Sequence, residues 1–499
     1  MNRLSVIVVL LLTTVGATLL ALNQANHAVI LTTDSIVYVD TARHIADGQG
    51  VATSILTLDA KQLPNPQTQY PPLYPMVMSP FIRFGVEPIL AGRLVSAISF
   101  GLTVMLLGLW AWRLAGPLAG LAAAALVTTL PAMTSVAAAV WADSLYTLLV
   151  TGLAWLGWEL TQKPAGRLRW FVLGALAGLG LLDKYLGILL LGVVAVTVLL
   201  TLRHGPARWL AIQRLGLALA GVALFAVPLL LRNVMLNRAI GGADRGPSSQ
   251  PLLDIIGDAL VTVSGDFTAT VLWIATLIVV VITLGISLRN AESRRPLAAL
   301  WPIIITFVVY LVGLIAARFL IDTDRIHTRF TMPVYPLVVL LYVIVIAWAA
   351  KTFNQRASSI VLAALAIVSI AWSVKTYDFT SPAYTPKPSS RTMLIAQLTT
   401  ERDLIIGDRA REYNLFLGRA VIQLSDDQTE PKLTPERLAE LHNRWSGRFN
   451  RTVLAFSPNL DSKEYGPLAA QLSSGAPLEG LNLVRAERPL FVYQYQASP

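Results

Sequence analysis

Residues 332–349 read MPVYPLVVLLYVIVIAWA, a stretch of 18 residues without a charged side chain. Such a run is typical of a helix that crosses a bilayer, because about 20 helical residues span the roughly 30 Å hydrocarbon core. Working outward from it, apolar runs between charged or Pro/Gly-rich breaks predict about eleven spanning helices. They lie near residues 5–22, 89–112, 117–131, 137–158, 170–182, 185–202, 210–231, 269–288, 298–317, 332–349 and 357–375.

In two places, consecutive apolar runs are separated by only a few residues. Each of the pairs 117–131/137–158 and 170–182/185–202 could be one broken helix instead of two spans. We therefore predict a polytopic α-helical membrane protein in which the exact number of spans depends on these breaks.

The composition of the chain supports a membrane protein. Hydrophobic residues make up 55% of its 499 residues and charged residues only 14%, and the mean hydropathy is +0.61. A soluble globular chain is about a quarter charged, so this chain could not cover itself with polar surface. It contains no cysteine, which excludes disulfides, thiolate zinc sites and cysteine nucleophiles.

The positive charge is distributed unevenly. The formal charge is +10, yet residues 378–499 contain 14 basic and 14 acidic residues, so the whole excess lies in residues 1–377. A bias of cations toward cytoplasmic loops explains an excess in the hydrophobic part. We therefore predict membrane lipids, and not nucleic acid, as the partner of this charge.

The orientation follows from the same rule. If the N-terminus is cytoplasmic, the loops on that side contain only two acids, Glu159 and Glu292, and many cations. These cations are Arg3, Arg113, Lys163, Arg167, Arg169, Arg203, Arg208, Arg214, Arg289, Arg294, Arg295, Lys351 and Arg356. An odd number of spans then places the C-terminal region outside. The first run resembles a signal peptide, but the spans behind it favour a retained anchor. We predict a multi-pass protein of the plasma or inner membrane.

Three long segments, residues 23–88, 232–268 and 377–499, are not apolar and fall on the external side. We divide the chain into a membrane domain, residues 1–376 with the first two segments as loops, and an extracytoplasmic domain, residues 377–499. Long structured loops in a compact protein are usually functional.

The last segment alternates strand-like and helical patterns, which predicts a small α/β domain. The predicted strands are 404–407, 420–424, 452–456 and 491–495, and the predicted helices are 409–417, 435–445 and 464–472. The segment shows neither a phosphate-binding glycine pattern nor a cluster of metal ligands. No cofactor is predicted, and a divalent metal, although possible, is not indicated.

The first external segment contains a candidate base. Asp34–Asp47 is predicted to form a short helix on the membrane surface, with Asp34 and Tyr38 on one face and Asp40 paired with Arg43 on another. A carboxylate just outside the bilayer could act as a general base toward a lipid-borne substrate. Asp34 could instead serve as the N-cap of this helix.

Aromatic and basic residues follow. Tyr70 and Tyr74 flank a proline-rich stretch, which fixes an extended chain, and their rings could stack on a sugar or form an ordinary interfacial belt. Arg93 lies at the outer end of the second span, where it could bind substrate or extend toward the interface.

Further ionisable residues lie at the external ends of other spans. Asp143 begins a span, where a carboxylate is a site hypothesis and helix capping is the alternative. Lys184 follows Asp183 directly, and adjacent helical residues do not face each other. Lys184 could therefore meet an anion.

The segment from Asp322 to Phe330 is the most informative, because its cations oppose the charge bias of the other loops. It contains Arg325, His327 and Arg329, and Arg318 precedes it. Arginine suits phosphate through its planar fork, although pairing with the neighbouring aspartates is an alternative. Acids and cations at one membrane level fit a reaction with a hydroxyl nucleophile and an anionic leaving group, in which the cations stabilise the departing phosphate.

The order of these motifs resembles the GT-C glycosyltransferases of the protein O-mannosyltransferase and aminoarabinose-transferase type. The resemblance covers most of residues 1–375. It rests on Asp34 with Tyr38 and Ala42, Pro72–Pro75, Gly92-Arg93-Leu94, Trp141-Ala142-Asp143, Asp183–Gly187, Arg329-Phe330 and Pro333–Pro336.

The resemblance implies an enzyme that uses a polyprenyl-phosphate sugar, inverts at the anomeric carbon and transfers to a lipid, glycan or protein acceptor. It implies that Asp34 and Asp143 are catalytic acids and that Lys184, Arg325 and Arg329 include the phosphate-binding cations. Many members have two adjacent acids in the first loop, whereas Ser35 follows Asp34 here. The base therefore falls to Asp34 alone.

Two other classes of protein share the polytopic pattern. A transporter or flippase of lipid-linked saccharides is expected to show inverted repeats and charges near the midplane. Here the charges lie at the external ends and no repeat is visible. A non-catalytic component of cell-envelope polysaccharide assembly is the third class.

Overall fold

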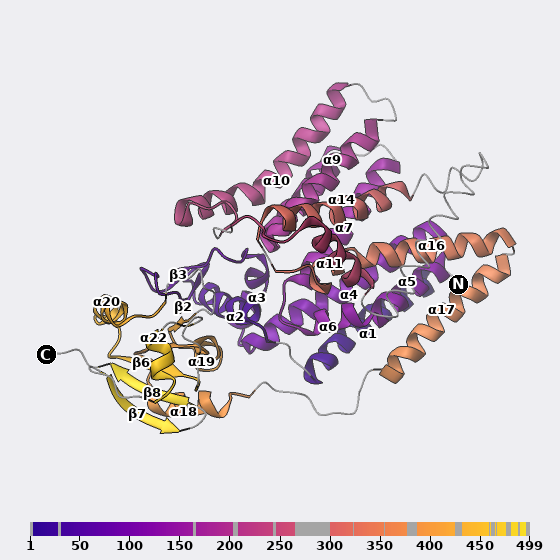
Figure 1. Ribbon diagram of the computed structural model, residues 1–499. Helices are drawn as coiled ribbons and strands as arrows, with labels where there is room; N and C mark the ends of the chain where they lie inside the picture. Colours follow the sequence, from indigo (N-terminus) through magenta and orange to yellow (C-terminus); the bar gives the residue numbers. More distant parts are fainter. Residues whose placement is uncertain are drawn as a thin grey trace. The chain divides into compact units, whose positions relative to one another are not determined.

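The structure is a computed structural model, drawn as a ribbon in Figure 1. It describes residues 3–27, 31–162, 166–202, 208–242, 246–264, 300–322, 324–353, 355–376, 387–424, 432–458, 460, 465, 467–475, 481–487 and 490–495. The predicted span at 269–288 lies outside the described residues. The chain divides into two compact units: unit 1 comprises residues 1–30, 68–74 and 92–384, and unit 2 comprises residues 31–67, 75–91 and 385–499.

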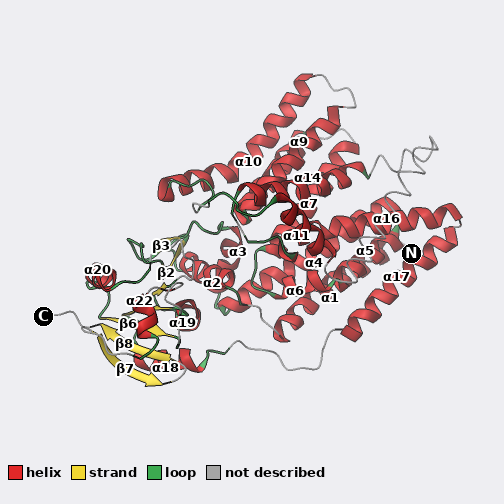
Figure 2. Ribbon diagram, viewed as in Figure 1, coloured by secondary structure: helices red, strands yellow, loops and turns green. Residues whose placement is uncertain are grey.

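Unit 1 is helical (Figure 2). Its helices are α1 (Arg3–His27), most of α4 (Pro88–Ala115), α5 (Pro117–Thr129), α6 (Pro131–Ala138), α7 (Asp143–Gln162), α8 (Arg167–Asp183), α9 (Leu189–Leu202), α10 (Arg208–Asn237), α11 (Leu252–Ser264), α14 (Trp301–Leu320), α15 (Thr328–Thr331), α16 (Tyr335–Phe353) and α17 (Gln355–Thr376). Two single 3₁₀ turns, η1 (Tyr185–Ile188) and η2 (Met332–Val334), lead into α9 and α16.

Several of these helices are suited to a bilayer. Among the described residues, five stretches are long and apolar enough to cross a membrane, or six if the bent pair α5 and α6 is one span. The five are Ile7–Gln24, Pro88–Ala115, Trp209–Asn237, Trp301–Leu320 and Thr328–Trp348. The polytopic membrane fold is thus confirmed, and the count of about eleven spans stays a prediction.

Both doubtful pairs of apolar runs are interrupted. The break of 61° between α5 and α6 occurs at Leu130, and Pro131 begins α6, as expected of a residue with a fixed φ and no N–H to donate. In the second pair, α8 ends at Asp183 and Lys184 is extended, with φ −144° and ψ 140°. Neither pair is a continuous helix.

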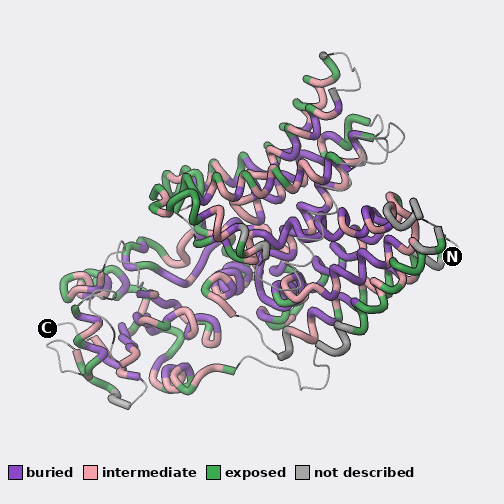
Figure 3. The backbone as a smooth tube through the Cα atoms, turned by 45° about the vertical axis from the view of Figure 1, so that its right-hand side comes forward, coloured by how far each residue is buried: buried purple, intermediate pink, exposed green. Residues whose placement is uncertain are grey.

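Helices α8 and α10 of unit 1 approach each other closely. A Cβ added at Gly174 would overlap the carbonyl oxygen of Ala218, and one at Gly178 would lie 2.8 Å from that of Val222. Small residues four apart let helix backbones approach closely where lipid surrounds them. Trp110, Tyr146 and Trp170 are buried. Figure 3 shows buried segments, in purple, running along the helices of unit 1.

Unit 2 is built on a six-stranded sheet with the order β2-β5-β4-β6-β8-β7 (Figure 2). The strands are β2 (Ile55–Leu56), β5 (Val421–Gln423), β4 (Asp403–Gly407), β6 (Arg451–Phe456), β8 (Leu490–Tyr495) and β7 (Leu481–Glu487). The pairs from β2 to β6 are parallel, whereas β8 pairs antiparallel with both β6 and β7. A small antiparallel pair, β1 (Ala52–Thr53) and β3 (Asn65–Pro66), lies apart from this sheet.

Unit 2 also contains helices, several of which pack against the sheet. They are α2 (Thr33–Ala46), most of α3 (Leu73–Arg83), α18 (Ser390–Leu398), α19 (Ala410–Leu417), α20 (Pro435–Trp445) and α22 (Pro467–Leu472). All five residues of β4 are buried, as expected of a central parallel strand covered on both faces.

Most local elements of unit 2 agree with the sequence patterns. Strands β4, β5, β6 and β8 and helices α19 and α20 lie within one or two residues of the predicted ranges, and α22 begins at Pro467 instead of residue 464. Strand β2 was not predicted. Its pairing of Ile55 with Val421 shows that the first loop completes the sheet.

Two expectations about α2 were wrong. The N-cap is Thr32, whose backbone N–H donates to the Ser35 hydroxyl at 3.1 Å, and Asp34 lies in the first turn instead. Asp40 does not pair with Arg43. Its carboxylate accepts hydrogen bonds from the Thr53 hydroxyl, the Ser54 N–H and the Asn414 amide. Arg43 donates to the carbonyl of Leu415 at 2.9 Å. Seven of the 14 residues of the helix are buried. Its position on the membrane surface stays a prediction.

Candidate active site

The centre of the candidate site is Asp143, the first residue of α7. Its side chain has no exposed surface, and it accepts hydrogen bonds from two cations. Lys184 Nζ lies 2.6 Å from Oδ1, and Arg329 Nη2 and Nε lie 3.1 and 3.3 Å from Oδ2. The N-terminal end of a helix favours a negative charge, which further stabilises the carboxylate.

The turn after α8 positions Lys184. Because its backbone is extended, its side chain leaves the line of the helix and meets Asp143 on α7. Gly187 lies against the backbone of Gly180 and Leu181, where a Cβ would overlap main-chain atoms. Only glycine fits this close approach, so the short Asp183–Gly187 sequence builds a defined turn.

Arg329 is fixed by an aromatic ring and a short helix. Its guanidinium carbon lies 4.0 Å from the ring centre of Trp141, close enough for cation–π stacking. It belongs to α15, whose N-cap is His327. The His327 Nδ1 accepts from the Arg329 N–H at 3.4 Å.

The electrostatics of this group favour an anion. One carboxylate faces two cations, which leaves an excess positive charge, and the side chains of Lys184 and Arg329 retain 13% and 19% exposure. Partial burial lowers the pKa of His327 below its ordinary value, and the neighbouring Arg329 lowers it further. His327 is therefore a neutral hydrogen-bonding group at neutral pH.

Asp183 was not predicted as a site residue, although it precedes Lys184. It has no exposed surface, and in the described part of the chain neither carboxyl oxygen has a hydrogen-bond partner. A buried carboxyl group without a partner is unusual. Its burial could not be read from the sequence.

A polar network joins the turn after α8 to two loops, and it was also missed. The hydroxyl of Tyr185 donates to the carbonyl of Thr68 at 2.5 Å and accepts from the Asn233 amide at 2.9 Å. The Asn237 amide and the Thr68 hydroxyl both donate to the Gly242 carbonyl. Two asparagines on the apolar helix α10 were the available sequence signal.

Three other predicted residues, Tyr70, Tyr74 and Arg93, also belong to unit 1. Tyr74 is fully buried, and its hydroxyl lies 2.9 Å from the carbonyl of Gly92 and 2.8 Å from the Ser96 hydroxyl. Arg93 is buried and donates to the carbonyl of Leu22 at 3.0 Å. Tyr70 is half-buried. Asp34, half-buried, and Tyr38, buried, belong to unit 2.

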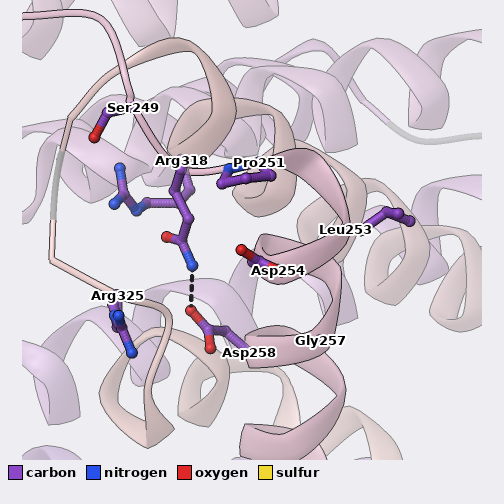
Figure 4. Close-up of a pocket in the computed structure, with 9 residues that line it drawn as sticks. Ser249, Pro251, Leu253, Asp254, Gly257, Asp258, Arg318 and Arg325 are labelled. Atoms are coloured by element: carbon purple, nitrogen blue, oxygen red, sulfur yellow. Dashed lines mark hydrogen bonds between the residues drawn. The ribbon is translucent and has the colours of Figure 1, made fainter.

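Arg325 lines a different part of unit 1 from Arg329. It faces a pocket of about 600 Å³ together with Arg318, Asp254 and Asp258 (Figure 4). Arg318 is held by the Asp322 carboxylate at 3.0 Å and the Ser248 hydroxyl at 2.9 Å. The Gln250 amide donates to Asp258 at 2.8 Å. The predicted phosphate-binding cations are thus divided: Lys184 and Arg329 contact Asp143, whereas Arg325 lines this pocket.

No group of three or more possible metal ligands from His, Cys, Asp or Glu occurs in the described residues. Asp143 is already neutralised by two cations, so it is a poor ligand for a divalent ion.

Comparisons with known proteins bear on the fold. Residues 69–231 match the model of a family described as dolichyl-phosphate-mannose-protein mannosyltransferase. ArnT from Cupriavidus metallidurans bound to undecaprenyl phosphate is 14% identical, with a TM-score of 0.63 over 100% of this chain and 99% of that chain. Its apo state is 15% identical, with a TM-score of 0.62 over 97% of each chain. The chain has the GT-C fold.

A more distant GT-C structure covers part of its own length. The archaeal oligosaccharyltransferase AglB from Archaeoglobus fulgidus, in complex with an inhibitory peptide and a dolichol-phosphate, is 12% identical with a TM-score of 0.50. The similarity covers 91% of this chain and 69% of that chain. A comparison with curated protein sequences found no match. The family match at residues 69–231 includes Asp143 and Lys184 and ends before Arg329.

Proposed function

We propose that this protein is a membrane glycosyltransferase that moves a sugar from a polyprenyl-phosphate carrier to a hydroxyl acceptor, with inversion at the anomeric carbon. The observation that carries the proposal is the buried Asp143 carboxylate with Lys184 and Arg329 hydrogen-bonded to it. This arrangement holds two partly exposed cations close together, as the binding of a phosphate group requires.

The chemistry of the donor is supported by the comparisons. ArnT was solved with undecaprenyl phosphate, AglB with a dolichol-phosphate, and the matching family is described by a dolichyl-phosphate sugar. The carriers are all long isoprenoid phosphates. For this chain we infer the same class of donor, and the sugar is left open.

In the proposed reaction Lys184 and Arg329 bind the phosphate that links lipid and sugar. As the glycosidic bond breaks, negative charge grows on the departing phosphate oxygen, and the two cations stabilise it. The His327 imidazole, neutral at neutral pH, can hydrogen-bond to the same group. Catalysis thus depends on cations that are held in place before the donor arrives.

Asp143 takes a positioning role in this scheme. A carboxylate that already accepts hydrogen bonds from Lys184 and Arg329 has a low affinity for a further proton, so it is a weak base. We therefore assign the base to Asp34, which removes the proton of the acceptor hydroxyl while that oxygen attacks the anomeric carbon.

The remaining predicted residues receive supporting roles. Arg325 and its pocket are proposed to contact the polar part of a substrate, and the half-buried Tyr70 is proposed to contact a sugar ring. Tyr38, Tyr74 and Arg93 are buried, so we propose that they support the loops around the site.

We place the reaction on the extracytoplasmic face of the plasma or inner membrane. The N-terminus is cytoplasmic in this proposal, and the sheet of unit 2 forms an extracytoplasmic domain. The acceptor, whether lipid, glycan or protein, meets the donor at the level where the lipid tail enters the bilayer.

The proposal is tested by transfer from labelled donors. Purified protein is incubated with a panel of labelled polyprenyl-phosphate sugars and candidate acceptors, and Asp34→Asn is compared with the natural chain. We expect transfer from at least one donor and a loss of at least 100-fold in the variant. Equal transfer by both proteins would remove Asp34 from the mechanism, and donor binding without any transfer would contradict the enzymatic function.

A further inference from the structure

A second group of charged and aromatic residues lies at the other end of the helices from Asp143. Glu159 is 16 residues beyond Asp143 on α7, a distance of about 24 Å at 1.5 Å per helical residue. Arg113 of α4 and Arg169 of α8 lie beside it, and Arg214 of α10 stacks on Trp170, the residue after Arg169. We call this group the Trp–Arg cluster, and its members are Trp110, Arg113, Trp155, Trp158, Arg169, Trp170 and Arg214.

The rings of the cluster are packed against one another. Trp110 stacks on Trp155 with ring centres 6.3 Å apart and planes 10° apart, and it meets Trp158 at 5.9 Å. Arg113 lies 5.0 Å from the ring centre of Trp155, and Arg214 lies 5.4 Å from that of Trp170. The guanidinium groups of Arg113 and Arg214 are therefore held by aromatic faces.

The cluster has more positive charge than its acid can neutralise. Glu159 is paired with Arg113 and lies 3.8 Å from Arg169, and both arginine side chains are more than half exposed. Arg214 has no carboxylate partner among the described residues. One carboxylate and three guanidinium groups leave a net positive charge that an anion can meet.

The indole groups supply hydrogen-bond donors without acceptors. The N–H groups of Trp110, Trp155, Trp158 and Trp170 have no hydrogen-bond partner in the part of the chain that the structure describes. Trp110 and Trp170 are 0% and 2% exposed, so bulk water does not satisfy them. Because these N–H groups are buried, a head group at the protein surface meets the guanidinium groups and not the indoles.

Apolar side chains beside the cluster are exposed. Leu168 and Trp209 are 72% and 70% exposed, and Ile212 is 61% exposed on the same end of α10. Exposed apolar residues of a membrane helix face acyl chains. The surface thus combines guanidinium groups with an apolar wall, as an amphipathic anion requires.

We propose that the Trp–Arg cluster binds the head group of an anionic phospholipid in the leaflet opposite the proposed active site. The guanidinium groups of Arg169 and Arg214 contact the phosphate, and the acyl chains lie along the exposed residues of α8 and α10. Basic sites between helices are known to recognise such head groups on the cytoplasmic side. The proposal is independent of sugar transfer.

The test is native mass spectrometry of the purified full-length protein. The protein is offered phosphatidylglycerol, phosphatidylcholine with the same acyl chains, or inorganic phosphate. We expect one retained phosphatidylglycerol with at least tenfold preference over phosphatidylcholine. Equal retention of the two lipids would overturn the proposal, and so would displacement of phosphatidylglycerol by inorganic phosphate at equal concentration.

Variants locate the site. The double variant R169Q/R214Q should lose the preference at least tenfold, R169K/R214K should keep most of it, and Arg356→Gln, a cation at the start of α17 outside the cluster, should keep all of it. Unchanged preference in R169Q/R214Q would place the lipid elsewhere. The affinity for a polyprenyl-phosphate sugar is measured in parallel, and we expect it to be unchanged, so failure of the donor proposal is distinguishable from failure of this one.

Discussion

Lys184 Nζ lies 2.6 Å from Oδ1 of Asp143, and the side chain of Asp143 has no exposed surface. The two residues are 41 positions apart in the chain and belong to different helix ends. Because Arg329 contacts the other carboxylate oxygen, the acid fixes two cations at once. Its removal should therefore disturb both.

Asp143→Asn should lower the turnover number more than the donor affinity. The variant keeps the size of the side chain but removes the charge that orients Lys184 and Arg329, and a misplacement of about 1 Å can lower a rate about 100-fold. Turnover number and KM for the donor are measured on the same preparation. An unchanged turnover number would show that the cations do not depend on Asp143.

Arg329→Ala should weaken donor binding by about tenfold to 100-fold, because hydrogen bonds to charged groups contribute about 1.5–3 kcal/mol. Arg329→Lys should recover part of the affinity, since lysine keeps the charge but loses the fork and the stacking on Trp141. Arg437→Ala is the control, because Arg437 belongs to unit 2 and pairs with Asp59. Equal losses at both positions would contradict the assignment of the phosphate to Arg329.

Gly174→Ala should destabilise unit 1, because the added Cβ would overlap the carbonyl oxygen of Ala218 on α10. Overpacking of this kind costs about 1–3 kcal/mol. Gly216→Ala, in α10 itself, is the matched control: its Cβ would have no neighbour within 4 Å, and alanine favours the helix. The midpoints of thermal unfolding in detergent should separate the two variants, and similar midpoints would count against tight packing of α8 on α10.

Asp40→Ala should destabilise unit 2 by about 1–3 kcal/mol, because it leaves buried donors from Thr53 and Asn414 without their acceptor. Asp59→Ala is the control. Asp59 is 61% exposed and pairs with Arg437 at the surface, so its loss should change stability by less than about 1 kcal/mol. The stability of both variants is measured by chemical denaturation, with limited proteolysis reporting the unfolding of unit 2. An Asp40 variant as stable as the Asp59 variant would refute the buried-acceptor role.

The stability of unit 2 should fall in acid through Asp403. Burial raises the pKa of this carboxyl group, but hydrogen bonds from Arg451 and Thr400 outweigh burial and bring the pKa below its ordinary value. A lowered pKa contributes stability above the unfolded pKa, about 3.9, and that stability is lost as pH falls through the folded pKa.

Asp403→Asn should therefore be less stable than the natural chain at pH 7, and the difference should shrink below about pH 4. Thermal unfolding between pH 3 and pH 7 checks this. A difference that stays constant across the range would show that the ionised form of Asp403 is not the stabilising one.

Single helices and strands could be predicted from the sequence better than the pairing between them. Periodicity and length located the apolar helices and, within one or two residues, strands such as β4 and β6, because these patterns reflect burial of one segment at a time. The pairing of Ile55 with Val421 could not be predicted in this way. It joins two short strands separated by most of the chain, and neither strand has a distinctive pattern.

The candidate site shows the same division. Asp143, Lys184 and Arg329 were singled out because charges are rare at the ends of apolar runs, and the structure brings these three together. Arg325 shares a segment with Arg329 but faces a different pocket, because the direction of a side chain in a loop depends on its backbone. Burial of Asp183 depends on the packing of several helices, which no local pattern encodes.

The pair β2–β5 also constrains how the chain is made. Val421 is synthesised 366 residues after Ile55, which corresponds to about 20–70 s at 5–20 residues per second. Throughout this time the first loop has no sheet to join, and α2 has no α19 to pack against. A fragment that begins at residue 385 would lack β2 and leave the edge of β5 uncovered, which invites edge-to-edge association. The C-terminal part of unit 2 is therefore best expressed together with β2 from the first loop.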